Sequence, residues 1–208
     1  MHWLRVILLP LCMLACSDRA RMQSGTILPD SVQLKAGDVV FRRGSGFTSH
    51  AVLLAEGQEG VYSHTGIVVD SAGVLMIVHA VPGEPDYEGD EDRVKMERPE
   101  EFFLLTKAQQ GAVYRHKDSA KALSAARQAW QTYQRHPQFD HDYDASDTTA
   151  LYCTELVLYA YRQARAPLKG VKCHHLHLVG FESDCFLPSD LRKSSDLKLV
   201  VAFYTDKY

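Results

Sequence analysis

The chain has 208 residues, a formal net charge of −3, and hydrophobic and charged fractions of 46% and 24%. This length predicts one domain with enough residues to bury a core, and the composition is that of an ordinary globular protein. Because the chain has no excess of basic residues, the composition argues against nucleic acid as a partner.

The first 16 residues, MHWLRVILLPLCMLAC, predict an export signal. Arg5 provides the positive start, and the apolar run 6–14 is too short to span a membrane as a mature helix. The end of the segment, Ala15-Cys16, resembles the lipobox of bacterial lipoproteins, in which cleavage leaves the cysteine at the N-terminus with lipid attached. We therefore expect lipidation of Cys16, and an ordinary secretory signal cleaved nearby is the alternative.

These signals also predict a location and a domain division. The lipobox resemblance implies a lipoprotein of the cell envelope that is held to a membrane by its N-terminal lipid. Ser17 after the cysteine favours the outer membrane in the bacterial sorting pattern. With 1–16 as the signal, residues 17–30 are polar and predict a tether, and residues 31–208 predict the folded domain.

The first half of this domain is predicted to consist mainly of strands. Short apolar or alternating runs bounded by turn residues predict strands at 38–41, 63–69 and 74–81, and the last two form a hairpin. A less regular alternation predicts a short helix at 48–56, and residues 82–92 predict an acidic surface loop.

The second half mixes helices and strands. Residues 118–135 carry alanines at helical spacing and predict a helix that ends before Pro137. In the last predicted strand, at 197–204, we expect the side chains of Leu199, Val201 and Phe203 on one face. The other predicted elements are strands at 93–97, 111–115 and 197–204, a polar-aromatic loop at 139–144 and a helix at 148–165. Two groups of strands with helices between and after them predict an α+β fold with an antiparallel sheet.

Cys153 lies near the predicted start of the 148–165 helix. A thiol in the first turn of a helix feels the positive end of the helix dipole, which lowers its pKa and favours the nucleophilic thiolate. The alternative is a buried cysteine that packs as a small hydrophobe. Outside the signal the chain has three cysteines, and an odd number in an exported protein suggests one free and reactive thiol.

Two histidines could complete a catalytic group with this cysteine. A cysteine hydrolase needs a thiolate, a histidine that pairs with it, and a third polar group that orients the imidazole. His64 opens one predicted strand and His79 lies on the next, so a hairpin would bring the two rings together. A histidine would then be the third member, acting through a ring nitrogen. Satisfied surface or core histidines are the alternative.

Several segments along the chain resemble one family, the circularly permuted papain-like, NlpC-related cysteine hydrolases of the YiiX/YebB type. They cover most of residues 37–204 in the same order. The matching segments are GDVVFRRG (37–44), YSHTGIVV (62–69), VHA (78–80), FDHDYD (139–144), LYCTELV (151–157) and FLPSDL (186–191).

The resemblance implies a papain-like α+β fold in which the cysteine helix packs against a small antiparallel sheet or barrel. It places the nucleophile at Cys153 and the motif histidine at His64. The third position falls on His79, where many relatives have a glutamate. It further implies that the thiolate attacks an amide or ester carbonyl in a cell-wall peptide or an acyl lipid, without a cofactor or a metal, and that His64 protonates the leaving group.

Two tyrosines precede the candidate nucleophile in the sequence. The backbone N–H of Cys153 can contribute to an oxyanion hole, and the hydroxyl of Tyr143 or Tyr152 could add to it. The alternative is that both rings only cover the start of the helix. Glu155 is expected to be structural, binding the neighbouring loop or a basic side chain.

Two other functions remain open at this point. One is a non-catalytic lipoprotein that binds lipid or peptidoglycan on the same scaffold. The other is a metal site in the segment Cys173-His174-His175-x-His177, with Cys185 eight residues further on. Because no CxxC or HxxxH spacing occurs there, a solvated loop is favoured, with a Cys173–Cys185 disulfide as the second possibility.

Overall fold

A computed structural model of the chain describes residues 25–178 and 181–205. The predicted signal with Cys16, and the tether up to residue 24, lie outside the described residues. Residues 25–30 lie against the domain, since Thr26 forms a β-bridge with Leu104 and the Ile27 N–H donates to the Phe103 carbonyl at 2.9 Å. The end of the predicted tether, residues 25–30, therefore packs against the folded domain.

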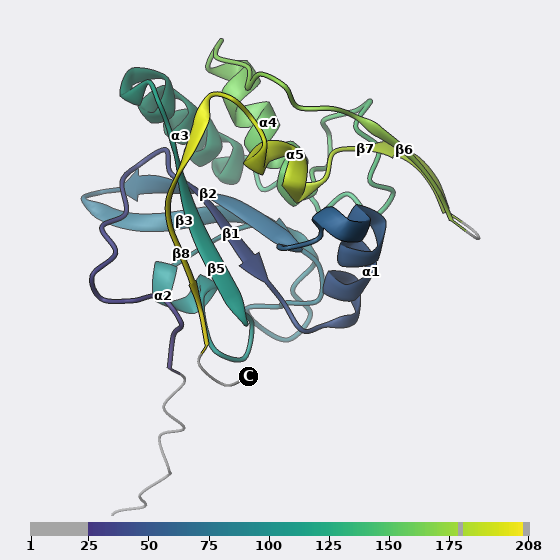
Figure 1. The fold of residues 1–208 in the computed structure, drawn as a ribbon, viewed down its shortest axis with the longest axis horizontal. Coiled ribbons are helices and arrows are strands. Elements are labelled where there is room, and N and C mark those ends of the chain that lie inside the picture. The colour runs from purple at the N-terminus through teal and green to yellow at the C-terminus, as the bar shows by residue number, and fades with distance from the viewer. Residues whose placement is uncertain (1–24, 179–180, 206–208) are drawn as a thin grey trace, which may run out of the picture.

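The centre of the fold is a sheet of six strands in the order β4-β3-β2-β1-β5-β8, with every neighbouring pair antiparallel (Figure 1). A separate two-stranded hairpin, β6–β7, projects from the body of the domain. The strands are β1 (Val39–Arg43), β2 (His64–Ser71), β3 (Val74–Val81), β4 (Arg93–Glu97), β5 (Gln110–His116), β6 (His174–Leu178), β7 (Phe181–Cys185) and β8 (Leu197–Tyr204).

The two longest helices pack together on one face of the sheet (Figure 1). The helices are α1 (Phe47–Glu56), α2 (Pro99–Phe102), α3 (Ser119–Gln134), α4 (Cys153–Gln163) and α5 (Pro188–Arg192), and a 3₁₀ turn, Gly57–Glu59, follows α1. At the start of α3 the side chain of Asp118 accepts the N–H groups of Ala120 and Lys121, which explains why the helix begins there.

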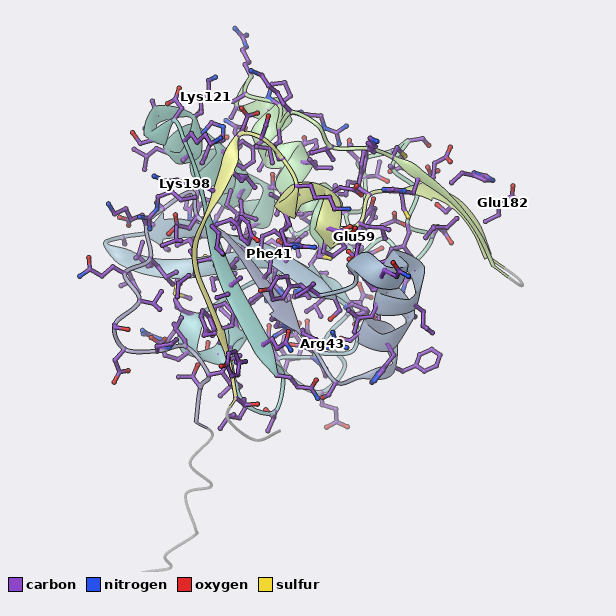
Figure 2. The ribbon with its side chains drawn as sticks, in the orientation of Figure 1. Phe41, Arg43, Glu59, Lys121, Glu182 and Lys198 are labelled. Carbon is purple, nitrogen blue, oxygen red and sulfur yellow. The ribbon has the colours of Figure 1, made fainter. Side chains whose placement is uncertain are left out.

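The alternation of side chains along the central strands divides the core into two layers. Phe41 and Ile67 face the helices and pack with α3 and α4, and Figure 2 shows Phe41 in the interior between sheet and helices. The adjacent positions, such as Val40 and Val68, face the other side and pack against α2 and the segment that contains Leu28. The centre of the sheet is therefore covered on both faces, whereas β8 at its edge has several exposed residues.

The predicted α+β class with an antiparallel sheet is confirmed, whereas three details are corrected. The cysteine helix begins at Cys153 and not at residue 148, because Asp147 folds back to accept the Thr149 N–H and closes a local turn. The predicted loop around residues 173–185 is the β6–β7 hairpin. In β8 the pairing skips one residue, so that Leu199 is 54% exposed whereas Phe203 is 8% exposed.

Candidate active site

Cys153 is the first residue of α4, and Tyr152 is its N-cap. The helix is anchored by Leu156 and Val157, which are fully buried against the sheet. The thiol lies 3.8 Å from the hydroxyl of Thr154. The cysteine therefore occupies the helix N-terminus that the sequence predicts, on an element that packing holds rigidly.

The electrostatic setting of Cys153 differs from the prediction. Burial raises the pKa of the thiol, and it outweighs the opposing effects of the Thr154 hydroxyl, the Thr65 N–H and the Arg42 charge. The helix N-terminus is present, but burial disfavours the charged form of the thiol. Cys153 is therefore a neutral thiol in the resting site, and its proton must be removed by a neighbouring base.

His64 and His79 form a hydrogen-bonded pair across β2 and β3. Nε2 of His64 lies 2.9 Å from Nδ1 of His79, and the two ring planes are inclined by 77°. A side chain at Gly66, beside them, would bring its Cβ within 3.2 Å of the His79 Cβ and 2.7 Å of Ile77 Cγ2. Glycine at this position of β2 thus allows β3 to approach closely next to His79.

The ring of Phe102 packs on both histidines. It stacks on His64 with ring centroids 5.5 Å apart and meets His79 edge-on at 5.2 Å. The guanidinium of Arg42 lies 4.7 Å from the centroid of the Phe102 ring. Burial, together with the charge of Arg42, lowers the pKa of His64 well below its ordinary value. The imidazole is therefore held neutral, in the form that can accept a proton.

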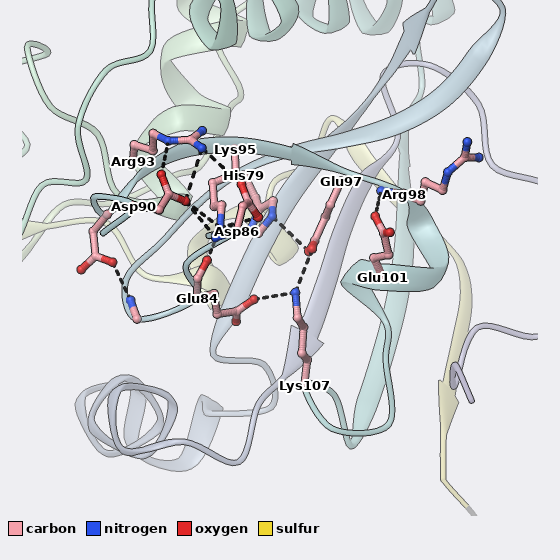
Figure 3. A network of polar contacts seen from close by, with 12 residues as sticks. His79, Glu84, Asp86, Asp90, Arg93, Lys95, Glu97, Arg98, Glu101 and Lys107 are labelled. Atoms are coloured by element: carbon pink, nitrogen blue, oxygen red, sulfur yellow. Dashed lines mark hydrogen bonds and ion pairs between the residues drawn. The ribbon is translucent and has the colours of Figure 1, made fainter. Parts of the chain in front are cut away.

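A charged cluster continues from His79 to the edge of the sheet (Figure 3). Glu97 Oε1 lies 3.1 Å from His79 Nε2, and Glu97 Oε2 lies 2.8 Å from Lys107 Nζ. Lys107 also pairs with Glu84 at 2.9 Å, and Glu84 pairs with Arg42. The acidic residues are therefore balanced by two cations next to the histidine pair.

The acidic loop at 82–92 is also tied to β4 by ion pairs (Figure 3). Lys95 binds Asp86 at 2.8 Å, and Arg93 binds Asp90 at 3.0 Å. The loop predicted to be a solvated surface segment thus has a fixed connection to the strand that carries Glu97.

Cys153 and His64 line the same cavity, which has a volume of about 390 Å³. The charged side chains Arg42, Glu84 and Lys107 also line it, together with the residues that lead into α1. Among the described residues, no hydrogen bond joins the Cys153 thiol to His64 directly. The predicted pair thus lines one cavity without a direct hydrogen bond between the two side chains.

A second, apolar cavity of about 190 Å³ lies between α1 and α5 and also reaches Cys153. Its side chains are almost entirely aliphatic, aromatic or thiol groups. They include Ala51, Val52, Ala55, Leu176, Cys185, Phe186 and Leu187. The nucleophile candidate therefore lies where a polar and an apolar cavity meet.

The two predicted oxyanion tyrosines differ in their environments. Tyr143 lines both cavities, and its backbone is left-handed with φ of 53°. Burial raises the pKa of Tyr143, with the nearby Cys153 as the second cause, so its hydroxyl stays protonated. The hydroxyl of Tyr152 accepts the Phe186 N–H at 2.7 Å, so this side chain has the covering role that was the alternative.

Glu155 occupies the third position of α4 and is fully buried. Neither carboxyl oxygen has a regular hydrogen bond to a described residue. Burial raises the pKa of this carboxyl to about 8, so it is neutral at pH 7. The expected ion pair with a basic side chain is therefore not formed among the described residues. The carboxyl is buried in the core, as expected for a structural residue.

The hairpin cysteines are separate thiols in the structure, with Cys173 exposed and Cys185 buried. His174 Nε2 lies 2.9 Å from Asp190, and His175 Nδ1 lies 2.9 Å from Asp184. For His177 only the backbone is described. In residues 25–178 and 181–205 no group of three or more metal-ligating side chains is arranged to hold a metal ion.

Four residues next to the site were not singled out by sequence reasoning. Glu97 ends the predicted strand 93–97, whereas Arg42 follows the predicted strand 38–41 and belongs to β1 in the structure. Phe102 and Lys107 lie in a segment to which no element was assigned, and their role depends on tertiary packing. The four are Arg42, Glu97, Phe102 and Lys107.

Together these observations define a mixed α+β protein with a cysteine at a helix N-terminus and a histidine pair on adjacent antiparallel strands. No protein-family model matches the chain, and no curated protein is significantly similar to it. Within the described part of the chain, no helix is long and apolar enough to cross a membrane.

The structure is similar to the crystal structure of the metalloprotein YiiX (DUF1105) from Escherichia coli O157:H7. The TM-score is 0.64, the sequence identity is 18%, and the match covers 84% of this chain and 100% of that chain. At this identity the likeness concerns the fold, and the chain therefore has a YiiX-like fold.

Proposed function

We propose that the protein is an exported cysteine hydrolase of the permuted papain-like, NlpC-related type, with Cys153 as nucleophile and His64 as general acid and base. The observation that carries this proposal is the single cavity that receives both the thiol and the imidazole. The hydrogen bond from His64 to His79 adds the third member of such a site.

The reaction proceeds through an acyl-enzyme. Nδ1 of His64 takes the thiol proton as Sγ of Cys153 attacks the carbonyl carbon, and the C–S bond forms. The imidazolium then gives this proton to the leaving nitrogen or oxygen, whose bond to carbon breaks. A water molecule, deprotonated by His64, hydrolyses the thioester and releases a carboxylic acid and the free thiol.

The charge that develops on the carbonyl oxygen needs hydrogen-bond donors. The N–H of Cys153 lies in the first turn of α4, where it has no acceptor within the helix. The Tyr143 hydroxyl is the second donor in this proposal, because its side chain lines both cavities next to the thiol. Each such donor contributes about 3 kcal/mol to the stabilisation of the transition state.

The apolar cavity favours an acyl lipid over a cell-wall peptide as substrate. An acyl chain bound against Val52, Ala55 and Leu187 would remove apolar surface from water, with about 0.8 kcal/mol gained per buried CH₂ group. The polar head group would then lie in the larger cavity with Arg42 and Lys107. The predicted lipid on Cys16 would keep the enzyme at a membrane, where such substrates are found.

Labelling with an acyl-type electrophile tests this proposal. The wild-type protein is expected to be labelled at Cys153, and Cys153→Ala is expected to lose all labelling while remaining folded. Cys173→Ser is the matched control, because it removes an exposed thiol outside both cavities. Absence of labelling in the wild type, with binding of fatty acid retained, would favour the non-catalytic lipid-binding lipoprotein instead.

A further inference from the structure

In the charged cluster next to the histidine pair, the carboxylate of Glu97 lies close to the ring of His79. Glu97 lies two residues along β4 from Lys95, the register partner of His79, so its side chain reaches the ring diagonally. Its Oε1 is 3.1 Å from Nε2 of His79. Neither of these two buried atoms has a hydrogen bond of regular geometry to any described group, so their 3.1 Å approach is the nearest polar contact that each makes.

Glu97 is itself held in place by cations. Oε2 of Glu97 lies 2.8 Å from Lys107 Nζ, and Oε1 lies 3.8 Å from the guanidinium of Arg42. Burial alone would raise the pKa of Glu97, but its contacts with His79 and Lys107 outweigh burial and lower the pKa to about 2. The side chain is therefore an anion at every pH at which the protein works, and it can only accept a proton in a hydrogen bond.

We infer that Glu97 is a positioning residue that sets, through His79, the tautomer of His64 in which Nδ1 is free to accept a proton. The catalytic use of that lone pair rests on the proposed function. The arrangement of Glu97, His79 and His64 does not depend on it. An anionic carboxylate 3.1 Å from Nε2 of His79 favours the tautomer with the proton on Nε2, which leaves the lone pair on Nδ1.

The same logic passes to the next ring. Nδ1 of His79 can only accept, so Nε2 of His64, 2.9 Å away, must be the donor. A neutral imidazole has one proton, and with Nε2 protonated the lone pair of His64 is on Nδ1. This is the nitrogen that the histidine pairing leaves for the cavity shared with Cys153. If His79 carried its proton on Nδ1 instead, His64 would present N–H to the thiol and could not act as a base.

Histidine ¹⁵N spectroscopy tests the inference without requiring any activity, because protonated and unprotonated ring nitrogens have well-separated shifts. The full protein is labelled at its imidazole nitrogens, and the rings are assigned with His64→Gln and His79→Gln. The wild type is expected to show protonated Nε2 and unprotonated Nδ1 in both rings. In Glu97→Gln, which can donate as well as accept, both rings are expected to populate the opposite tautomer.

Glu84→Gln is the matched control. It removes the same charge from the same cluster, since Glu84 also pairs with Arg42 and Lys107, but it makes no hydrogen bond or ion pair with either histidine. The ring shifts are expected to stay in place in this variant. Glu97→Asp, which keeps the charge but withdraws it from His79 by one methylene, provides a second test if Glu97→Gln fails to fold.

The labelling rate of Cys153 is followed in the same samples. We expect Glu97→Gln to slow it by about ten- to a hundredfold at pH 7, since a wrong tautomer removes the base. Unchanged tautomers in both Glu97 variants, or a wild-type His64 with its proton on Nδ1, would overturn the inference and leave the proposed hydrolase standing. Unlabelled wild-type Cys153 with the expected tautomer change would overturn the hydrolase and support the inference.

Discussion

Nε2 of His64 lies 2.9 Å from Nδ1 of His79, and this contact leaves Nδ1 of His64 as the ring nitrogen available to the nucleophile candidate. Both rings are almost completely buried, and Phe102 packs on both of them. The orientation of His64 is therefore fixed by groups on other strands and by α2, and a substrate does not need to induce it. The proposed site has its base in position before the thiol loses its proton.

The first prediction concerns the pH dependence of the proposed reaction. Charged or titratable groups face the histidine pair from β1 (Arg42), the 82–92 loop (Glu84), β4 (Glu97) and the segment after α2 (Lys107). Burial and the nearby cations lower the pKa of His64, so it remains a neutral base at pH values below the ordinary histidine pKa of about 6.5. The acid limb of kcat/KM is therefore expected well below pH 6.5.

The substitution His64→Ala removes the proposed base and tests the same prediction. Labelling of Cys153 should become slow at neutral pH, because burial raises the thiol pKa and no base is left. It should recover at alkaline pH, where the thiol ionises without help. A wild-type acid limb at or above pH 6.5, or an unchanged labelling rate in His64→Ala at pH 7, would show that His64 is not the base.

The second prediction concerns the apolar cavity. Ala55 on α1 lines it, and Ala55→Phe would fill part of its volume of about 190 Å³. If two or three methylenes of an acyl chain lose their site, kcat/KM for a long-chain ester should fall about tenfold or more. A short acetate ester does not reach the cavity and should be hydrolysed at the wild-type rate.

Leu54→Phe is the control for this change. Leu54 is the preceding residue of the same helix and is 82% exposed, so the new ring points to solvent. Hydrolysis of both esters should be unaffected by it. An equal loss for long and short esters in Ala55→Phe would show that the substitution disturbs Cys153 itself and that the cavity does not select acyl chains.

The third prediction concerns the N-terminal segment. Cys16→Ser removes the residue to which lipid would be attached, and the protein should appear in the soluble periplasmic fraction or remain unprocessed. The wild type should be in the membrane fraction and carry two or more acyl chains, which hold a protein more firmly than one. Mass spectrometry of the N-terminus measures the modification. An unmodified N-terminus after cleavage at another residue would support the ordinary secretory signal.

The sequence predicts much of the fold because its signals are local. The strand at 74–81 and the helix at 118–135 follow from periodicity, and both agree with β3 and α3 within a residue or so. The helix was predicted to start at residue 148 because aspartate, here Asp147, is a common N-cap residue. In the structure Asp147 closes a separate turn before α4. The β6–β7 hairpin was missed because its strands, His174–Leu178 and Phe181–Cys185, are short and rich in polar residues, which are also typical of a loop.

The site was predicted in part for the same reason. Cys153, His64 and His79 lie on regular elements, so their approach could be anticipated from the order of strands. The protonation state of the Cys153 thiol could not be predicted, because it depends on burial by residues far away in the sequence. Glu97 was likewise recognisable as the end of a strand, but its contact with His79 depends on the register of β3 and β4.

The last prediction concerns Glu155, whose carboxyl is fully buried without a regular hydrogen bond to a described residue. Burial raises its pKa in the folded protein to about 8, above the value of about 4.3 expected in the unfolded chain. A group with a raised carboxyl pKa supports the native state fully below the unfolded pKa. That support is lost as pH rises towards the folded pKa, because the unfolded chain ionises first.

Glu155→Gln, which mimics the protonated acid, removes this dependence. Its free energy of unfolding should be close to that of the wild type at pH 4 and about 4 to 5 kcal/mol higher at pH 8, measured by urea denaturation. Glu88→Gln, at an exposed position in the 82–92 loop, is the control and should follow the wild-type curve at both values. If Glu155→Gln also ran parallel to the wild type, the native carboxyl would be ionised at pH 8. The start of α4 would then hold an anion three residues from its N-cap, which would also raise the energy of a thiolate at Cys153.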